Sequence, residues 1–301
     1  MHTTTERHLR GPILCLCALA TLFLTVVPAG TYARELANVP LVVGLDHIPV
    51  AVGNLDSAAD LFRSLGFALK QGRPHANGIR NQHVKFPDGT EIELITAAEA
   101  RDSMTAEYRQ YLLNGDGPAF AGLYAPSIEQ VVERFSAAHV EYSRDAEMVT
   151  FPQANELHYL FIGSRNLTPT DRPENFAHWN TAESLIGVWL ASENPSAERH
   201  MLELLGADIS DMQVHVPYET RCPVARFPQG QVVLLPRSRQ QIPGRRIVGA
   251  TLRVRELSAL QHVLAANGMK VPVVIQTREG RSIFLPPELT HGLWLEFREL
   301  R

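Results

Sequence analysis

Apolar residues recur along the chain with two periods that follow one another in a fixed order. The β-branched apolar stretch 42–52 predicts a strand. Asn54 or Asp56 then caps a helix whose apolar residues lie three and four positions apart until Gly66. Shorter apolar stretches predict three further strands, at 67–69, 83–86 and 91–95. This part of the chain therefore has the order β-α-β-β-β.

The same order returns three times downstream. The further units start at Gly122, Gly187 and Gly249, and their closing apolar runs are 159–162, 232–235 and 293–297. Aligning the units strand on strand brings four residues to one position of the repeat, namely Gly66, His139, Gly206 and Gly268. Four units in register predict an α+β fold built from four βαβββ modules.

A stretch rich in Asn, Thr, Pro and Asp, residues 166–183, interrupts the repeat after its second unit. It predicts a linker between two halves. Residues 42–165 would hold modules one and two, and residues 184–301 would hold modules three and four. A chain of 301 residues is long enough for two such halves.

Composition places the chain among folded globular proteins, with 45% hydrophobic and 20% charged residues. The 28 Lys+Arg against 32 Asp+Glu give a net charge of −4, so no nucleic-acid partner is expected. The sequence also has no Gly-rich phosphate loop, no G-x-S-x-G nucleophile elbow and no C-x-x-C motif.

The first 33 residues have the three parts of a secretory signal. Arg7 and Arg10 precede an apolar run from Ile13 to Val27, and small residues lead to a predicted cleavage site after Ala33. The run is shorter than the roughly 20 residues of a membrane-spanning helix. Export to the periplasm or the medium is therefore expected. An uncleaved N-terminal anchor, which would hold the protein at a membrane, is the alternative.

Cysteine usage is compatible with export. Cys15 and Cys17 would leave with the leader, and the remaining chain keeps Cys222 alone, so it cannot form an internal disulfide. A single cysteine of this kind is more often a small buried apolar residue than a nucleophile. No catalytic role is predicted for Cys222.

Several segments resemble the vicinal oxygen chelate superfamily, which includes glyoxalase I, methylmalonyl-CoA epimerase and extradiol dioxygenases. The resemblance lies in four segments of the first unit: Asp46-His47-Ile48, 54–58, Leu65-Gly66-Phe67 and 91–95. The segment 284–297 resembles the last strand of the epimerases, and 75–95 with 178–182 resemble a glyoxalase-like group. The resemblance implies that the modules curl into two cup-shaped half-barrels.

The resemblance also implies a metal site, because the first and last strands of such modules carry the ligands. His47, Glu93 and Glu296 match ligand positions, whereas the positions equivalent to His47 in the other modules are Phe120, Gly187 and Gly249. Pairing module one with module four would bring the three matched residues together. They would hold one divalent ion (Mn, Fe, Co, Ni or Zn), with Glu93 and Glu296 also catalytic. A site without metal is the alternative.

Four further polar residues are candidates for contact with a substrate. His75 and Asn81 belong to the region that rims the cup in relatives. His178 precedes its module, and hydrogen bonds that fix the joint between the halves are its more ordinary role. His291 begins the last strand and is a candidate fourth ligand or proton shuttle.

Two functions remain open from the sequence. One is a metal-dependent isomerase or lyase acting on a small substrate with vicinal oxygens. The other is a metal-free protein that binds a small molecule in the same cup. The sequence does not indicate the substrate or the oligomeric state.

Overall fold

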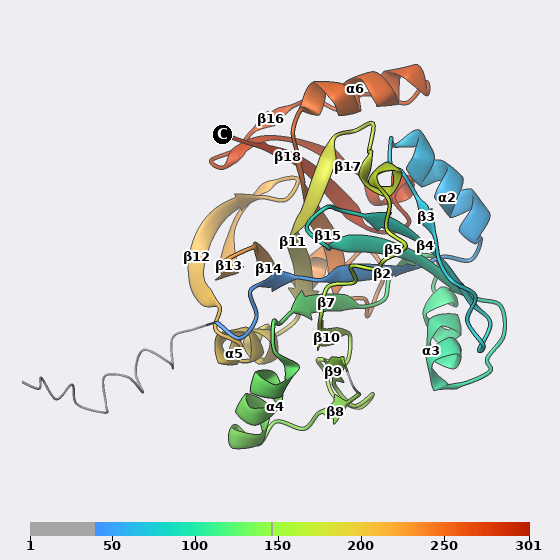
Figure 1. Ribbon diagram of the computed structural model, residues 1–301. Coiled ribbons are helices and arrows are strands. Elements are labelled where there is room, and N and C mark those ends of the chain that lie inside the picture. Colours follow the sequence, from blue (N-terminus) through green and yellow to red (C-terminus); the bar gives the residue numbers. More distant parts are fainter. Residues whose placement is uncertain (1–39, 146) are drawn as a thin grey trace, which may run out of the picture. The chain divides into compact units, whose positions relative to one another are not determined.

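The four-module repeat predicted from the sequence is confirmed in the computed structural model, which describes residues 40–145 and 147–301 (Figure 1). Residues from Pro40 onward form one unit by their contacts, so the predicted division into two halves at 166–183 stays a prediction. The predicted leader lies outside the described residues. Within the described residues, no helix combines the length and apolar character of a membrane span.

Module one follows the predicted order closely. Its elements are β1 (Gly44–Leu45), β2 (His47–Ala51), α2 (Leu55–Ser64), β3 (Lys70–Gln71), β4 (Ile79–Lys85) and β5 (Glu91–Ala97). Asn54 caps α2, because its side chain accepts a hydrogen bond from the Ser57 amide, while Asp56 lies in the first turn. The short strand predicted at 67–69 lies instead at β3.

Module two is preceded by a helix that the sequence pattern did not predict. This helix, α3 (Ser103–Leu112), is capped by Asp102 and buries only Thr105 and Tyr108, so its apolar period is weak. The module itself contains β6 (Gly117–Pro118), β7 (Ala121–Tyr124), α4 (Ile128–Ala137), β8 (Ser143–Arg144), β9 (Met148–Thr150) and β10 (Leu160–Gly163).

Modules three and four share one eight-stranded sheet with the strand order β12-β13-β14-β11-β15-β18-β17-β16. Module three contains β11 (Ala182–Ser192), α5 (Ser196–Leu204), β12 (Asp208–His215), β13 (Glu219–Phe227) and β14 (Gly230–Pro236). Module four contains β15 (Ile247–Val254), α6 (Leu257–Ala266), β16 (Ile275–Gln276), β17 (Gly280–Leu285) and β18 (Trp294–Leu300). Short 3-10 helices lie at Pro173–Phe176, Arg237–Arg239 and Pro287–Leu289.

The position that aligns Gly66 with its counterparts has one backbone conformation in all four modules. The φ angles of Gly66, His139, Gly206 and Gly268 are 90°, 55°, 94° and 67°. Each residue ends its helix in the left-handed region, which costs glycine little and other residues more. The shared angle confirms the register of the repeat.

Module one pairs with module two, so the predicted pairing of module one with module four is wrong. β1 pairs with β7 and β2 pairs with β6, both antiparallel, which joins the two modules along their first strands. β11 and β15 join modules three and four in the same way. The physical reason is that each first strand offers its free edge to the next module along the chain, the shorter connection.

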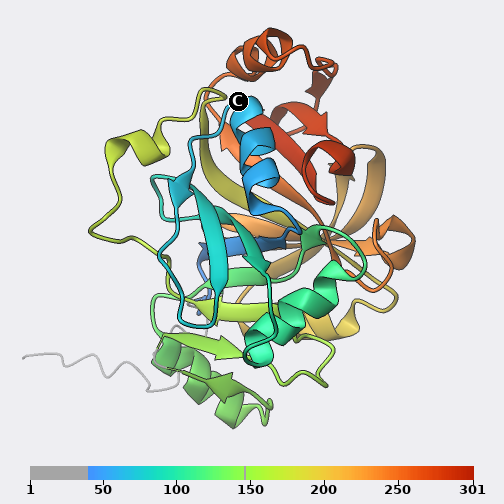
Figure 2. The ribbon, with the colours of Figure 1, turned by 90° about the vertical axis from the view of Figure 1, so that its right-hand side faces the viewer.

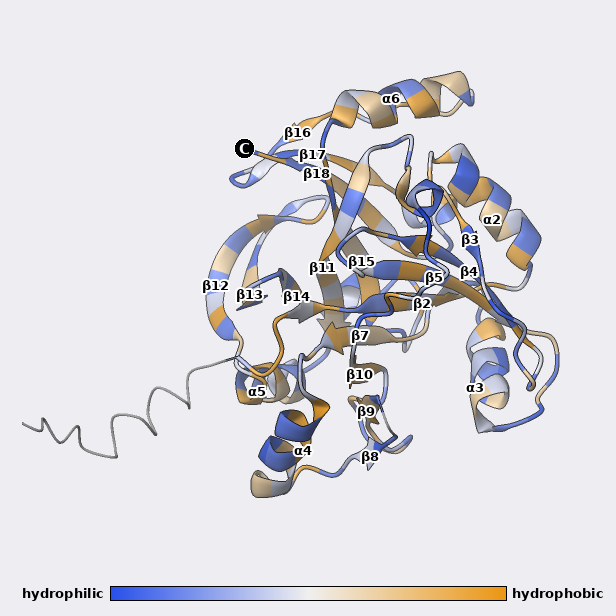
Figure 3. Ribbon diagram, in the orientation of Figure 1, coloured by the Kyte–Doolittle hydropathy of each residue, from blue (hydrophilic) through white to orange (hydrophobic). Residues whose placement is uncertain are grey.

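The strands of modules one and two form two five-stranded sheets, β3-β4-β5-β2-β6 and β1-β7-β10-β9-β8. The main apolar core contains residues of these sheets and of the eight-stranded sheet, such as Val50, Leu123, Leu185 and Leu252. Figure 2 shows α2 between the strands of module one and those of module four, and Asn267 donates a hydrogen bond to the carbonyl of Ser64 there. The central strands are largely apolar, while helices α2 and α4 carry polar residues (Figure 3). Strand residues of the opposite parity face away from this core, into the cups.

Candidate functional site

The first cup contains a polar cavity of about 640 Å³. Strand alternation explains its lining, because residues two apart on β5 and their partners on β4 and β2 lie on the same side of the sheet. The lining residues that carry titratable or amide groups are His47, Lys70, Gln71, Arg73, His75, Asn81, His83, Glu91, Glu93, Glu147 and Asn166.

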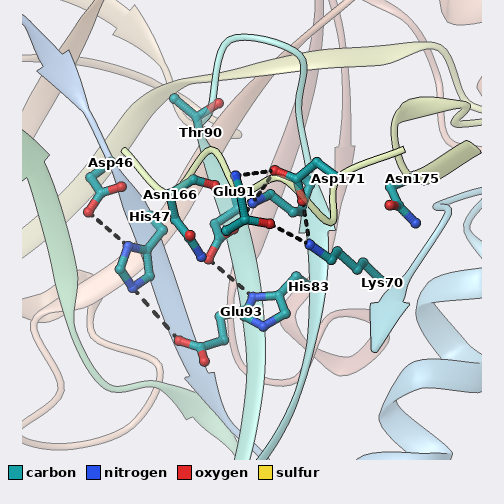
Figure 4. Close-up of polar contacts among 12 residues, drawn as sticks. Asp46, His47, Lys70, His83, Thr90, Glu91, Glu93, Asn166, Asp171 and Asn175 are labelled. Carbon is teal, nitrogen blue, oxygen red and sulfur yellow. Dashed lines mark hydrogen bonds and ion pairs between the residues drawn. The ribbon is translucent and has the colours of Figure 1, made fainter. Parts of the chain in front are cut away.

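Three side chains stand in a row at this cavity, Asp46, His47 and Glu93, and the last two line it (Figure 4). The Nδ1 atom of His47 lies 2.9 Å from Oδ2 of Asp46, and its Nε2 atom lies 3.7 Å from Oε2 of Glu93. The Asp46 carboxylate accepts a hydrogen bond from Nδ1–H of His47 and thereby orients the ring. Nε2 is consequently the ring nitrogen directed at Glu93 and the cavity.

Asn81 positions the other oxygen of Glu93. Its Nδ2 donates a 2.5 Å hydrogen bond to Oε1 of Glu93 in a buried environment. The amide oxygen of Asn81 is buried and has no partner among the described residues. A Cβ at position 72 would come within 1.7 Å of that oxygen, so Gly72 leaves the space that the amide occupies. The amide is thus fixed, with one acceptor free.

A second carboxylate, Glu91, lies beside this row. It is almost fully buried, and its Oε1 is 3.1 Å from Nδ1 of His83, while Oε2 lies 3.5 Å from Nζ of Lys85. Lys85 is also buried and contacts Asp171 at 3.0 Å. Because Asp171 belongs to the segment after β10, these ion pairs fasten that segment over the cavity.

Lys70 makes the same connection from β3. Its Nζ donates to Thr168 at 2.9 Å, to Thr170 at 2.8 Å and to Asp171 at 2.5 Å. Burial raises the pKa of Asp171, but the hydrogen bonds from Lys70, the Thr168 amide and Lys85 outweigh it, so the net pKa is far below the ordinary value. The segment 166–171 is therefore held as a wall of the cavity.

The carboxylates determine the charge state of His47. Burial lowers the pKa of the imidazole, but the nearby carboxylates, Asp46 above all, raise it to about 9. Burial raises the pKa of Glu91, but the hydrogen bond from His83 and the nearby positive charges lower it by more. The net pKa is below its ordinary value, so that carboxyl is ionised. At neutral pH the site therefore holds an imidazolium among carboxylates.

The residues present do not fit a divalent metal held by three protein ligands. His47 and Glu93 supply two, but the module-two residues at the equivalent positions are Phe120 and Phe161, which cannot ligate. The Phe161 ring lies edge-on to the His47 ring, with 4.9 Å between centroids. Among the described residues, no three His, Cys, Asp or Glu side chains converge in a set suited to a metal ion.

Glu296, expected as the third ligand and a catalytic group, lies in the second cup. Its oxygens accept hydrogen bonds from Thr251 at 2.8 Å, Ser282 at 2.5 Å and Arg298 at 2.8 Å, and the residue is fully buried. Its predicted convergence with His47 and Glu93 is wrong, because β18 pairs with β15 and β17. Glu296 does occupy the position of the repeat that is equivalent to Glu93, but it lies in the eight-stranded sheet, whereas Glu93 lies in a five-stranded sheet.

Of the four predicted substrate contacts, two line the cavity and two do not. His75 and Asn81 line the cavity, and both carry a buried polar atom without a partner among the described residues. His178 does not line it. Its Nδ1 accepts from the Ala68 amide at 3.0 Å and its Nε2 donates to the Lys85 carbonyl at 2.9 Å, which is the joint-fixing role. His291 contacts Asp116 at 2.8 Å and lies outside the cavity. It is therefore not placed to act as a metal ligand or to contact a substrate in this cavity.

Sequence reasoning missed several residues of the site. Asp46 stands next to His47, and this adjacency was a usable signal, since carboxylates commonly orient imidazoles. Lys85 and Asp171 carried no such signal, because they are 86 positions apart and meet only through the closing segment. In the sequence, the only signal for Phe161 was that module two has no carboxylate at the position equivalent to Glu93.

Comparison with known proteins agrees with the fold. Residues 45–217 match the family model described as glyoxalase-like domain. No curated protein matches. Among solved structures, a hypothetical protein from Staphylococcus aureus is 14% identical, with a TM-score of 0.57 over 86% of this chain and 100% of its own.

Two enzymes share the fold at similarly low identity. A variant of 4-hydroxymandelate synthase from Streptomyces coelicolor is 13% identical, with a TM-score of 0.62 over 86% of this chain and 93% of that one. A catechol 2,3-dioxygenase is 10% identical, with a TM-score of 0.59 over 87% and 91% of the two chains. The family match covers more than half of the sequence, and the chain belongs to the glyoxalase-like domain family of the vicinal oxygen chelate superfamily.

Proposed function

We propose that the first cup binds a small molecule with a carbonyl group and a neighbouring oxygen, and that it moves a proton on that molecule as an isomerase. The observation that carries the proposal is the row of Asp46, His47 and Glu93, of which His47 and Glu93 line a polar cavity. A carboxylate and an imidazolium in contact form an acid–base pair that needs no further group.

In this mechanism Glu93 takes the proton from the carbon next to the carbonyl. The imidazolium of His47 donates its Nε2 proton to the carbonyl oxygen, so that a neutral enediol forms and no charge is left on the substrate. Protonated Glu93 then gives its proton to the former carbonyl carbon, while the other hydroxyl of the enediol, on the carbon that was deprotonated, gives its proton to His47. This restores the imidazolium and the carboxylate and completes the isomerisation. Asn81 holds Glu93 in place, and Asp46 holds His47.

The cavity wall supports binding of a polar substrate. Asn81 Oδ1 and His75 Nε2 are buried polar atoms of the lining without hydrogen-bond partners among the described residues. Such atoms cost free energy unless a ligand or water satisfies them. Hydroxyl groups, which both donate and accept, suit this mixture.

The test is exchange of carbon-bound hydrogen in D₂O, followed by NMR with a panel of small α-hydroxy ketones and α-hydroxy aldehydes. We expect exchange by the wild type in the presence of EDTA. Loss of the base should reduce the rate in Glu93→Gln by about 10²-fold or more. His47→Gln should also be impaired, while Glu156→Gln, on the surface, serves as the charge-matched control.

Exchange that disappears with EDTA and returns with one divalent metal would overturn the metal-free mechanism. The second candidate function is a binding protein, and the aromatic residues at the two module-two ligand positions favour it. Binding of a panel compound without exchange, measured by calorimetry, would support that candidate instead.

Export is part of the proposal, because residues 1–33 have the composition of a secretory signal. N-terminal sequencing of the protein from the periplasm or the medium of a producing cell tests it. A first residue at Arg34 supports cleavage after Ala33, an intact Met1 in the membrane fraction supports an anchor, and protein found only in the cytoplasm contradicts export.

A further inference from the structure

The second cup has a cavity of its own, of about 550 Å³, at the end of its sheet. Four arginines line it: Arg165, Arg226, Arg253 and Arg298. Arg253 on β15 and Arg298 on β18 are directly opposite in the parallel ladder, and Arg226 comes from β13. Like charges placed opposite one another on a sheet destabilise it unless something neutralises them.

Arg298 is neutralised by the protein itself. It is 6% exposed and donates to Glu296 through two nitrogens at 2.8 Å, and its Nη1 contacts Glu279. Arg298 is therefore a wall of the cavity, with its donors already used.

The other three arginines keep donors free. The side chain of Arg226 makes no hydrogen bond with the described residues, and the carboxylate oxygen with which it pairs, on Glu279, is 3.9 Å away. The Nε atom of Arg253 and the Nη2 atom of Arg165 are buried without a partner in the described part of the chain. Nε of Arg253 lies 3.7 Å from Glu183, beyond hydrogen-bond distance.

The acidic residues that line this cavity do not neutralise the charges of these three arginines. They are Asp88 and Glu279. Asp88 accepts hydrogen bonds from Thr90 and, at 2.5 Å, from Ser184, and Glu279 is engaged by Arg298. Guanidinium groups with unused donors bind carboxylate and phosphate through paired hydrogen bonds.

We propose that the open end of the second cup is an anion-binding site that takes a small molecule through a carboxylate or phosphate group. Arg226 and Arg253, with side chains 45% and 42% exposed, would contact the anion directly. Arg165 would contact it from the segment after β10. The site is distinct from that of the proposed function, because no residue lines both cavities, and Arg226, Arg253 and Arg298 belong to the eight-stranded sheet.

The experiment measures binding of inorganic phosphate and of malonate to the full-length protein by calorimetry, with sodium chloride added to hold the ionic strength constant. We expect binding of at least one anion, and its affinity should fall about tenfold or more in the Arg226→Gln/Arg253→Gln double variant. The matched control is Arg199→Gln/Arg237→Gln, which removes the same charge from surface positions outside the cavity.

The two anions distinguish the two chemistries, since preference for phosphate or for malonate names the group that the site takes. Unfolding temperatures without anion check that both double variants fold. Absence of binding for both anions, or equal loss of affinity in the two double variants, would overturn the proposal, because the effect would then be general charge and not the site.

Discussion

The two cups are built from the same kind of module, but the strands form two five-stranded sheets in the first cup and one eight-stranded sheet in the second, and the interiors differ. The first cup keeps a charged cavity around His47 and Glu93, with apolar residues confined to the end near α3. The centre of the second cup is filled by Trp189, whose ring occupies the side of Gly249, the position equivalent to His47. The same kind of module therefore yields a candidate reactive site around a polar cavity in the first cup, and a centre filled by an indole in the second.

The equivalent glutamates show the same difference. Glu93 has one neighbour that holds it, Asn81, and faces His47 across 3.7 Å. Glu296 is surrounded by three donors and paired with Arg298. A carboxylate whose lone pairs are all used supports structure, whereas one with a free face is available for chemistry.

The largest effect is expected from emptying the second cup. Trp189 is 1% exposed, and its Nε1 donates to Thr251 at 3.0 Å. Trp189→Ala should lower the free energy of unfolding by about 3–5 kcal/mol through lost burial and a cavity, measured by denaturant unfolding. Trp189→Phe should retain most of the stability. A cost below about 1 kcal/mol for the alanine variant would show that the indole does not fill this cup.

Removing the partner of Arg298 should cost slightly less. Glu296→Leu leaves a buried guanidinium with Glu279 alone, and we expect a loss of about 3 kcal/mol in the free energy of unfolding. The double variant Glu296→Leu/Arg298→Met removes both charges and should recover much of it. If the single and double variants are equally unstable, packing, and not the ion pair, explains Glu296.

Acid should weaken the joint that His178 fixes through its hydrogen bonds with Ala68 and Lys85. Burial lowers the pKa of His178 to about 4, from its ordinary 6.5. Between pH 6.5 and 4 the unfolded chain binds a proton that the folded chain does not. Stability is therefore fully present above pH 6.5 and falls by up to about 3 kcal/mol as the pH drops to 4.

The matched variant is His178→Gln, whose amide can accept from Ala68 and donate to Lys85 without titrating. Its unfolding free energy should depend less steeply on pH across this window. Parallel pH curves for the two proteins would contradict the assignment.

The smallest effect on stability, and the sharpest on chemistry, is expected from supplying the missing ligand. Phe161→His would add an imidazole beside His47 and Glu93, which makes two imidazoles and one carboxylate. Titration with Co²⁺ should then produce visible absorption bands that the wild type and Phe161→Leu lack. Stoichiometric Co²⁺ binding by the wild type would refute the conclusion that a third ligand is missing.

The local elements could be predicted from the sequence because their causes are local. Asn54 caps α2 through its own side chain, and the residues at the Gly66 position end their helices by a backbone angle. α3 was not predicted, because only two of its residues are buried and its apolar residues therefore show only a weak helical period. The candidate residues His47, Glu93, His75 and Asn81 could be found because strand alternation and resemblance both point to the first cup.

The sequence by itself determined the number of modules, the register of the repeat and the face to which each strand residue points, since these depend on periods of a few residues. Only the tertiary structure decided which modules pair, and hence that Glu296 meets Arg298 and not His47. Edge pairing of strands uses backbone groups that nearly every residue carries, so the side chains do not indicate which strand will be the partner. The meeting of Lys85, Asp171 and Glu91 depends on that pairing and could not be seen before it.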